Sequence, residues 1–323
     1  MKQAVLQKLK TNEGILFLLF IAAFILMSVI SPGRFLRWFN IQSMAYQLPE
    51  FGILALSMTM VIISGGINLS LTFTATLAMI IGGLAMATLS ANGAATVWAL
   101  TAGVGLMCII AFACGAINGY VVAYLGITPM IATLGTSTLF EGIGLNITRG
   151  GAISGFPSAF MEIGNNTIGP VPIPMVIFIL VVIALHFFLE RSSFGTAIYM
   201  IGSNPKVARY SGINVRRMLF WVYAIAGFLT AVSGIIMASR YNSAKTDYGS
   251  AYLLQAVAAS VLGGTSITGG EGKIAGTIIA VMIIQVISSG LNIYGLNRYL
   301  TNIIIGAILL LVLSIKFFTN RRA

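Results

Sequence analysis

The sequence predicts an all-α protein, a polytopic transmembrane helical bundle of about ten spans forming a single domain over residues 1–323. Hydrophobic residues make up 58% of the chain and charged residues only 8%, whereas a soluble globular domain carries about 25% charged residues. The mean hydropathy is +0.98. So few charges cannot solvate a chain of this size in water, and lipid must cover most of its surface.

The apolar residues gather in stretches of the length that a membrane span needs. Crossing the hydrocarbon core takes about 20 mostly apolar residues in a helix. We expect helices because a helix satisfies its backbone polar groups internally, without water. The stretches are 14–31, 51–64, 72–90, 95–125, 128–147, 170–189, 219–238, 252–263, 272–289 and 299–317.

The lysines and arginines predict how the bundle is oriented. With an even number of spans and a cytoplasmic N-terminus, twelve of the 18 basic residues fall on the cytoplasmic side. Because cytoplasmic loops concentrate Lys and Arg, we expect both termini in the cytoplasm. The net charge of +11 then reports topology and not nucleic-acid binding. The cytoplasmic set is Lys2, Lys8, Lys10, Arg191, Lys206, Arg209, Arg216, Arg217, Lys273, Lys316, Arg321 and Arg322.

Residues 190–218 form the one sizeable segment expected on the cytoplasmic side. Gly202, Asn204 and Pro205 interrupt it, which predicts short helices joined by turns. Spaced apolar residues such as Ile198 favour a docking surface, and a solvated connector is the alternative.

A short internal similarity links two parts of the chain. The sequence GGINLS at 65–70 resembles GGTSIT at 263–268, and both are expected at cytoplasmic ends of spans. Transporters often carry internal repeats with broken helices near the transport path.

The chain lacks the parts from which enzymes build active sites. It has a single His, His186, and a single Asp, Asp247. The pair Gly272-Lys273 lacks the flanking residues of a phosphate-binding loop, although Gly272 and Gly276 would let helices approach closely. We therefore predict a non-enzymatic protein with no metal and no cofactor of its own. Cys108 and Cys114 are expected to be free thiols.

Neutral hydrogen-bonding side chains lie inside several of the predicted spans. Because hydroxyls and amides are costly to expose to lipid, we expect them to face other helices or a wet path. A path of amides and hydroxyls suits a neutral polyol such as a sugar, although helix–helix hydrogen bonding is the alternative for many Ser and Thr residues. The candidate path residues are Asn68, Ser70, Thr136, Glu141, Gln255 and Gln285.

Glu141 is the one carboxylate that the sequence places well inside an apolar span. Ionisable groups inside a membrane are rare and often functional. Arg149 is close enough in sequence to neutralise Glu141, and a role at the mouth of the path is the other interpretation.

Several long motifs resemble the permease subunits of ribose-type ABC sugar importers. They are MTMVIISGGINLS (58–70), IGSNPKVARYSGINV (201–215), SGINVRRMLFWVYAIAGFLTAVSGIIMASR (211–240) and QAVAASVLGGTSITGGEGKIAGTIIAVMIIQVISSGLNIYG (255–295). The resemblance covers most of the chain with compatible spacing. It implies the type II importer fold in a bacterial inner membrane.

The resemblance also implies partners. A second permease subunit, identical or different, would complete a central path, and a periplasmic binding protein would deliver the sugar. A cytoplasmic ATPase would bind ATP and Mg²⁺ and would dock on residues 190–218. The implied coupling residues are Gly202, Asn204, Ala208, Ser211 and Gly212.

Some residues depart from the family pattern and bear on the substrate. Asn68 stands where relatives usually have an acidic residue, and Leu71-Thr72 where they have Val-Gly. Residues 155–160 and 243–249 resemble the subgroup that imports the furanosyl signal autoinducer-2. We rank a neutral pentose or hexose first and autoinducer-2 second. A secondary sugar transporter ranks last, because buried acids for proton coupling are scarce.

Overall fold

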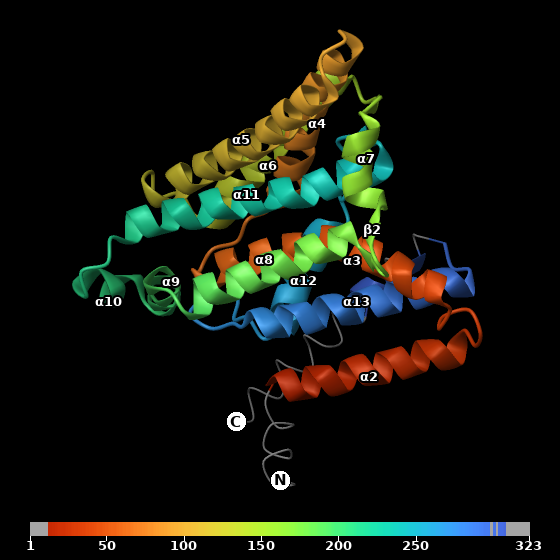
Figure 1. Cartoon of the computed structure of the whole chain (residues 1–323). Helices are drawn as coiled ribbons and strands as arrows, with labels where there is room; N and C mark the ends of the chain where they lie inside the picture. The colour runs from red at the N-terminus through yellow and green to blue at the C-terminus, as the bar shows by residue number, and fades with distance from the viewer. Residues whose placement is uncertain (1–11, 298–299, 302, 308–323) are drawn as a thin grey trace.

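The computed structural model describes residues 12–297, 300–301 and 303–307, which are mostly helical (Figure 1). Two antiparallel pairs of two-residue strands occur among them: β1 (Ile153–Ser154) with β4 (Ser243–Ala244), and β2 (Thr167–Ile168) with β3 (Val171–Pro172). The helices are α2 (Asn12–Ile30), α3 (Trp38–Ile63), α4 (Leu71–Ala91), α5 (Thr96–Ala123), α6 (Pro129–Thr148), α7 (Ser158–Asn165), α8 (Ile173–Glu190), α9 (Ser193–Ser203), α10 (Pro205–Tyr210), α11 (Val215–Tyr241), α12 (Tyr252–Leu262) and α13 (Ile274–Tyr294).

Seven of the described helices are long and apolar enough to cross a membrane, namely α2, α3, α4, α5, α8, α11 and α13. The predicted stretch 128–147 corresponds to α6, and the stretch 252–263 to the 11-residue helix α12. Most of the stretch 299–317 and the basic residues of both termini lie outside the described residues. A polytopic helical membrane protein is therefore confirmed, whereas the count of ten spans and the cytoplasmic termini stay predictions.

Helix α3 begins at Trp38, well before the expected start at residue 51. Its first half carries the polar residues Asn40, Gln47 and Glu50, so a search for apolar stretches does not detect this part of the helix. Each of these side chains hydrogen-bonds to a residue of another segment. Partners inside the protein therefore replace water along this part of the helix.

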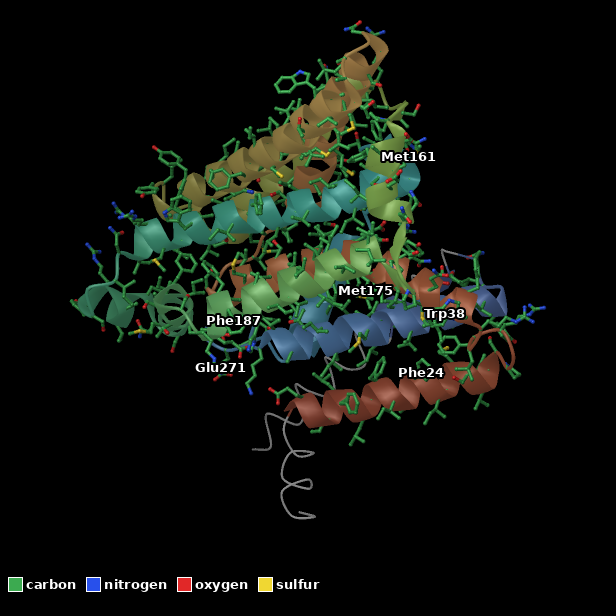
Figure 2. All side chains as sticks on the ribbon, in the orientation of Figure 1. Phe24, Trp38, Met161, Met175, Phe187 and Glu271 are labelled. Atoms are coloured by element: carbon green, nitrogen blue, oxygen red, sulfur yellow. The ribbon has the colours of Figure 1, made fainter. Side chains whose placement is uncertain are left out.

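The bundle has two ends, which we name after the helices they carry (Figure 1). At the α9 end, Lys273 forms an ion pair of 2.7 Å with Glu13, and the Tyr199 hydroxyl donates to the Gly272 carbonyl over 2.8 Å. Helices α2 and α13 therefore both start at this end. At the α7 end, Ser239 Oγ donates to the Phe160 carbonyl over 2.6 Å. Figure 2 shows the separation, with Glu271 near the α9 end and Met161 on α7.

Helix α3 lies at the centre of the larger hydrophobic core. It packs against α8, α11, α12 and α13, and α2 covers α13 from outside. A second apolar cluster joins α4, α5, α7 and α11. Polar groups also cross the core: Thr59 Oγ1 lies 2.9 Å from the hydroxyls of Ser260 and Thr277, all fully buried. Cys108 and Cys114 are free thiols, as expected.

Glycine lets the start of α13 pack directly on the turn that follows α12. A Cβ atom added to Gly276 would lie 1.9 Å from the Gly263 carbonyl oxygen, which no side chain tolerates. The expected close approach at Gly276 is thus confirmed. At Gly272 an added Cβ would meet the Thr265 side chain at 2.9 Å.

We expect Gly276→Ala to destabilise the protein, because its methyl group would collide with backbone and overpacking costs about 1–3 kcal/mol. The matched control is Gly105→Ala in α5, where nothing lies within 4 Å and where alanine favours the helix. The thermal unfolding midpoint of the detergent-solubilised protein measures both. Equal midpoints in the two variants would contradict the packing at Gly276.

Candidate functional site

Residues 64–70 connect α3 to α4 without helical structure, and side chains of α6 hold them. Thr133 Oγ1 accepts from the Leu69 amide over 3.1 Å and donates to the Ile67 carbonyl over 3.3 Å. Ser137 Oγ donates to the Leu69 carbonyl over 3.2 Å. The backbone polar groups that the broken helix leaves open are thus partly satisfied from outside the segment.

Three of the predicted path residues meet in one hydrogen-bond network. Ser70 Oγ donates to Asn68 Oδ1 over 2.8 Å, and Asn118 Nδ2 donates to Ser70 Oγ over 2.7 Å. Thr136 Oγ1 donates to Asn118 Oδ1 over 2.5 Å. The network joins the start of α4 to α5 and α6. Asn118, which is fully buried, is absent from our predicted set, although it is the only amide inside the apolar stretch 95–125.

The other three predicted residues lie elsewhere. Gln285 Nε2 donates to Gln47 Oε1 of α3 over 3.3 Å. Gln255 sits half-buried in the first turn of α12, and Glu141 sits half-buried in α6. Among the described ion pairs none joins Glu141 to Arg149, and the role of Glu141 at the mouth of the path stays a prediction. The path roles of all six residues stay predictions.

Glu50, and not Glu141, is the carboxylate buried inside a span. Its side chain is 0% exposed, and Arg240 Nη1 donates to its Oε1 over 2.7 Å. The Tyr241 and Tyr252 hydroxyls donate to Oε2 over 3.0 and 3.4 Å. The prediction that Glu141 is the one such carboxylate was wrong, because the predicted apolar stretch covers only the second half of α3 and starts one residue after Glu50.

The cluster around Glu50 ties three helices together towards the α7 end. Glu50 belongs to α3, Arg240 and Tyr241 to the end of α11, and Tyr252 to the start of α12. Ser233 Oγ of α11 also donates to the Glu50 carbonyl over 2.7 Å. A buried charge is tolerated only when it is paired and hydrogen-bonded, and this one has three side-chain partners.

Residues 190–218 fold into two short helices, as the breakers predict. The Asn204 side chain accepts from the amides of Lys206 and Val207 and so caps α10. Ala208 is fully buried, Ser211 Oγ donates to the Val207 carbonyl over 3.1 Å, and Gly212 adopts a φ of +82°. Gly202 is not a breaker, because α9 continues through it to Ser203.

The lack of a side chain at Gly202 serves backbone contact. A Cβ there would lie 1.9 Å from the Ile63 carbonyl oxygen, the last of α3, and 2.5 Å from the Gly270 amide. That amide donates to the Ile63 carbonyl over 2.9 Å. Gly65 and Gly269 adjoin the same point. The loops that contain the two similar segments, 65–70 and 263–268, therefore converge beside α9.

An open hollow of about 560 Å³ lies beside α10 and the start of α11. Lys206, Arg209 and Arg216 line it, with Pro205 and Ile213 between them. Tyr210 is 91% exposed at the end of α10. Arginine and tyrosine are enriched in protein–protein interfaces, so Arg209, Arg216 and Tyr210 are suited to contact a partner.

Replacing Glu50 alone should lower the stability of the protein more than replacing Glu50 and Arg240 together. We expect Glu50→Gln to cost roughly 3 kcal/mol, because Arg240 would keep a buried, unpaired charge. The double variant Glu50→Gln/Arg240→Gln should recover part of the loss in thermal unfolding, and the exposed Glu162→Gln should change nothing. A double variant less stable than Glu50→Gln would contradict a structural ion pair.

Comparison with known proteins places these features in a family. Residues 40–313 match the family described as branched-chain amino acid transport system / permease component. The Autoinducer 2 import system permease protein LsrD of Klebsiella pneumoniae subsp. pneumoniae is 34% identical over 315 residues, covering 94% of this chain and 91% of that protein. The LsrD proteins of Photorhabdus temperata (34%, 93% and 89%) and Yersinia pestis strain Pestoides F (35%, 85% and 83%) are also similar.

No solved structure matches this chain. The matched family covers most of the chain and includes both the residues around Glu50 and the whole segment 190–218. The chain therefore belongs to the ABC importer permeases of the family described as branched-chain amino acid transport system / permease component.

Proposed function

We propose that this chain is the membrane-spanning subunit of an ATP-driven importer of autoinducer-2 or a closely similar furanosyl compound. The observation that carries the proposal is the similarity to autoinducer 2 import permeases over 85% to 94% of the chain. It moves autoinducer-2 ahead of the neutral pentose or hexose that the motifs alone favoured. A pentose or hexose is the second candidate, because amides and hydroxyls bind any small polyol.

The proposed energy source is a separate ATPase that docks on the α9 end from the cytoplasm. The basic hollow beside α10 and the exposed Tyr210 support this docking site. A periplasmic binding protein would approach the α7 end, and a second permease subunit, identical or different, would complete the path. The proposed location of this chain is a bacterial inner membrane, and the seven long apolar helices support a location in a membrane.

The proposed coupling runs through backbone contacts. Closure of the ATPases on ATP would displace α9, and Gly202 would press on the end of α3 and on Gly270. Packed backbones cannot compress, so the linker 64–70 and the loop before α13 would move with α9. The transporter would thereby switch between outward and inward access.

Gly202→Leu should uncouple ATP hydrolysis from uptake, because its side chain would push α9 away from the Ile63 carbonyl. We expect uptake per ATP hydrolysed to fall about tenfold, the scale of a typical coupling free energy. Proteoliposomes that contain the complete importer measure both rates. The control Gly105→Leu makes the same substitution in α5, where nothing lies within 4 Å of an added Cβ, and should keep normal coupling. Gly202→Leu with normal coupling would refute the contact's role.

Substrate uptake tests the proposed function itself. Proteoliposomes with the permease, its ATPase and its binding protein should accumulate autoinducer-2 only when ATP is inside. ATP-dependent uptake of ribose without uptake of autoinducer-2 would favour the second candidate. Uptake driven by a proton or sodium gradient without ATP would refute an ABC importer altogether.

A further inference from the structure

A polar hollow of about 390 Å³ opens at the α7 end, between the first half of α3 and the last half of α13. Its size falls in the range of small-molecule sites, about 300–1,000 Å³. Its polar lining consists of Arg34, Arg37, Asn40, Ser43, Gln47, Ser289 and Asn292. The lining thus combines amides, hydroxyls and two guanidinium groups, and it contains no carboxylate.

Two facing rows of polar side chains lead from this hollow into the bundle. Residues 40, 43 and 47 share one face of α3, and residues 285, 289 and 292 share one face of α13, because their spacing is that of helical turns. Ser289 Oγ donates to Asn40 Oδ1 over 2.8 Å. Gln285 and Gln47 form the deeper link between the rows. From Asn292 to Gln285 the row extends about 10 Å along the helix.

The deeper link leaves hydrogen-bonding capacity for a ligand. An amide side chain offers two donors and two acceptor lone pairs, and the bond between Gln285 and Gln47 is long, at 3.3 Å. Towards the α9 end, Phe51, Leu54 and Ile284 belong to one buried apolar cluster. One turn deeper on the same helix faces lie Phe51 and Val281, both buried in that cluster, so the polar rows end at Gln47 and Gln285.

The lining also indicates what kind of solute fits. Guanidinium groups donate to oxygen atoms in fixed directions, while amides and hydroxyls both donate and accept. An amino acid would bring an ammonium group, and the hollow has no carboxylate to receive it. The hydroxyl groups of an oxygen-rich ring can both donate to and accept from the amides and hydroxyls of this lining.

We propose that this hollow is a substrate subsite in the outward half of the path, and that Gln47 and Gln285 bind the hydroxyl groups of a small oxygen-rich ring. The choice of ring rests on the proposed function. The network around Asn68 is buried, whereas this hollow is open. Gln47 Nε2 also donates to Ser43 Oγ over 3.0 Å, so Gln47 and Gln285 each keep one amide N–H for a ligand.

Protection of a cysteine in the hollow tests the subsite directly. In a variant with Cys108 and Cys114 replaced by alanine, Ser43→Cys should react with a maleimide added from the α7 side. The permease–ATPase complex without a binding protein isolates the permease's own site. We expect autoinducer-2 at millimolar concentration, which suits a weak binding site, to slow the labelling of this cysteine about fivefold. Leucine at the same concentration should leave the labelling rate unchanged.

Companion variants separate binding from a general change of shape. Gln285→Leu and Gln47→Leu, singly and together, should abolish the protection while the complex still hydrolyses ATP. A control cysteine, Ser90→Cys, lies at the exposed end of α4 and should not be protected by autoinducer-2. A control substitution, Thr101→Val, removes a hydroxyl that donates to carbonyls of its own helix, and it should preserve the protection of Ser43→Cys. Absence of protection, or equal protection by leucine, would overturn the subsite.

Uptake by the complete importer distinguishes the two proposals. Autoinducer-2 uptake without protection at Ser43→Cys would refute the subsite and leave the function standing. Protection by autoinducer-2 or by ribose, without uptake of autoinducer-2, would refute the function and leave an oxygen-ring subsite standing.

Discussion

Helix α9 meets the end of α3 through backbone atoms, and no side chain stands between them at Gly202. A contact of this kind has little freedom to absorb a displacement, because close-packed atoms resist compression. It also includes the Gly270 amide, which hydrogen-bonds to the same Ile63 carbonyl. The contact at Gly202 therefore joins α9 to two different connections, the linker 64–70 and the loop that leads into α13.

The short helix α12 relates this junction to the opposite half of the bundle. Its first residue, Tyr252, contacts the buried Glu50, and the loop after its last residue runs through Gly269 and Gly270 to the junction. The ion pair between Glu50 and Arg240 fixes the surroundings of its first turn. Helix α12 therefore connects the junction beside α9 to the buried ion pair towards the α7 end.

Much of the fold could be predicted because composition and helix length are local properties. The same is true of the helix break at Asn204, which depends on one capping side chain and the proline after it. Glu50 was missed because the polar first half of α3 made the predicted span start at residue 51. Its partner Arg240 is distant in sequence, so only the fold shows that the charge is neutralised. Gly202 was misread for the same reason: a glycine that breaks a helix and a glycine that admits another backbone look alike in a sequence. The six predicted path residues lie at separate places in the structure. A hydrophobicity pattern identifies polar residues within spans, but it does not show which other residues they face.

The side of the membrane on which α9 and α10 lie is the most direct test of this account. Tyr210→Cys, in a chain with Cys108 and Cys114 replaced by alanine, reports it through a membrane-impermeant maleimide. Intact spheroplasts should leave this cysteine unlabelled and permeabilised spheroplasts should label it. Asn92→Cys, at the exposed end of α4, should be labelled in intact spheroplasts. Labelling of Tyr210→Cys in intact spheroplasts would place α10 outside the cytoplasm, where no ATPase can reach it, and would contradict the account.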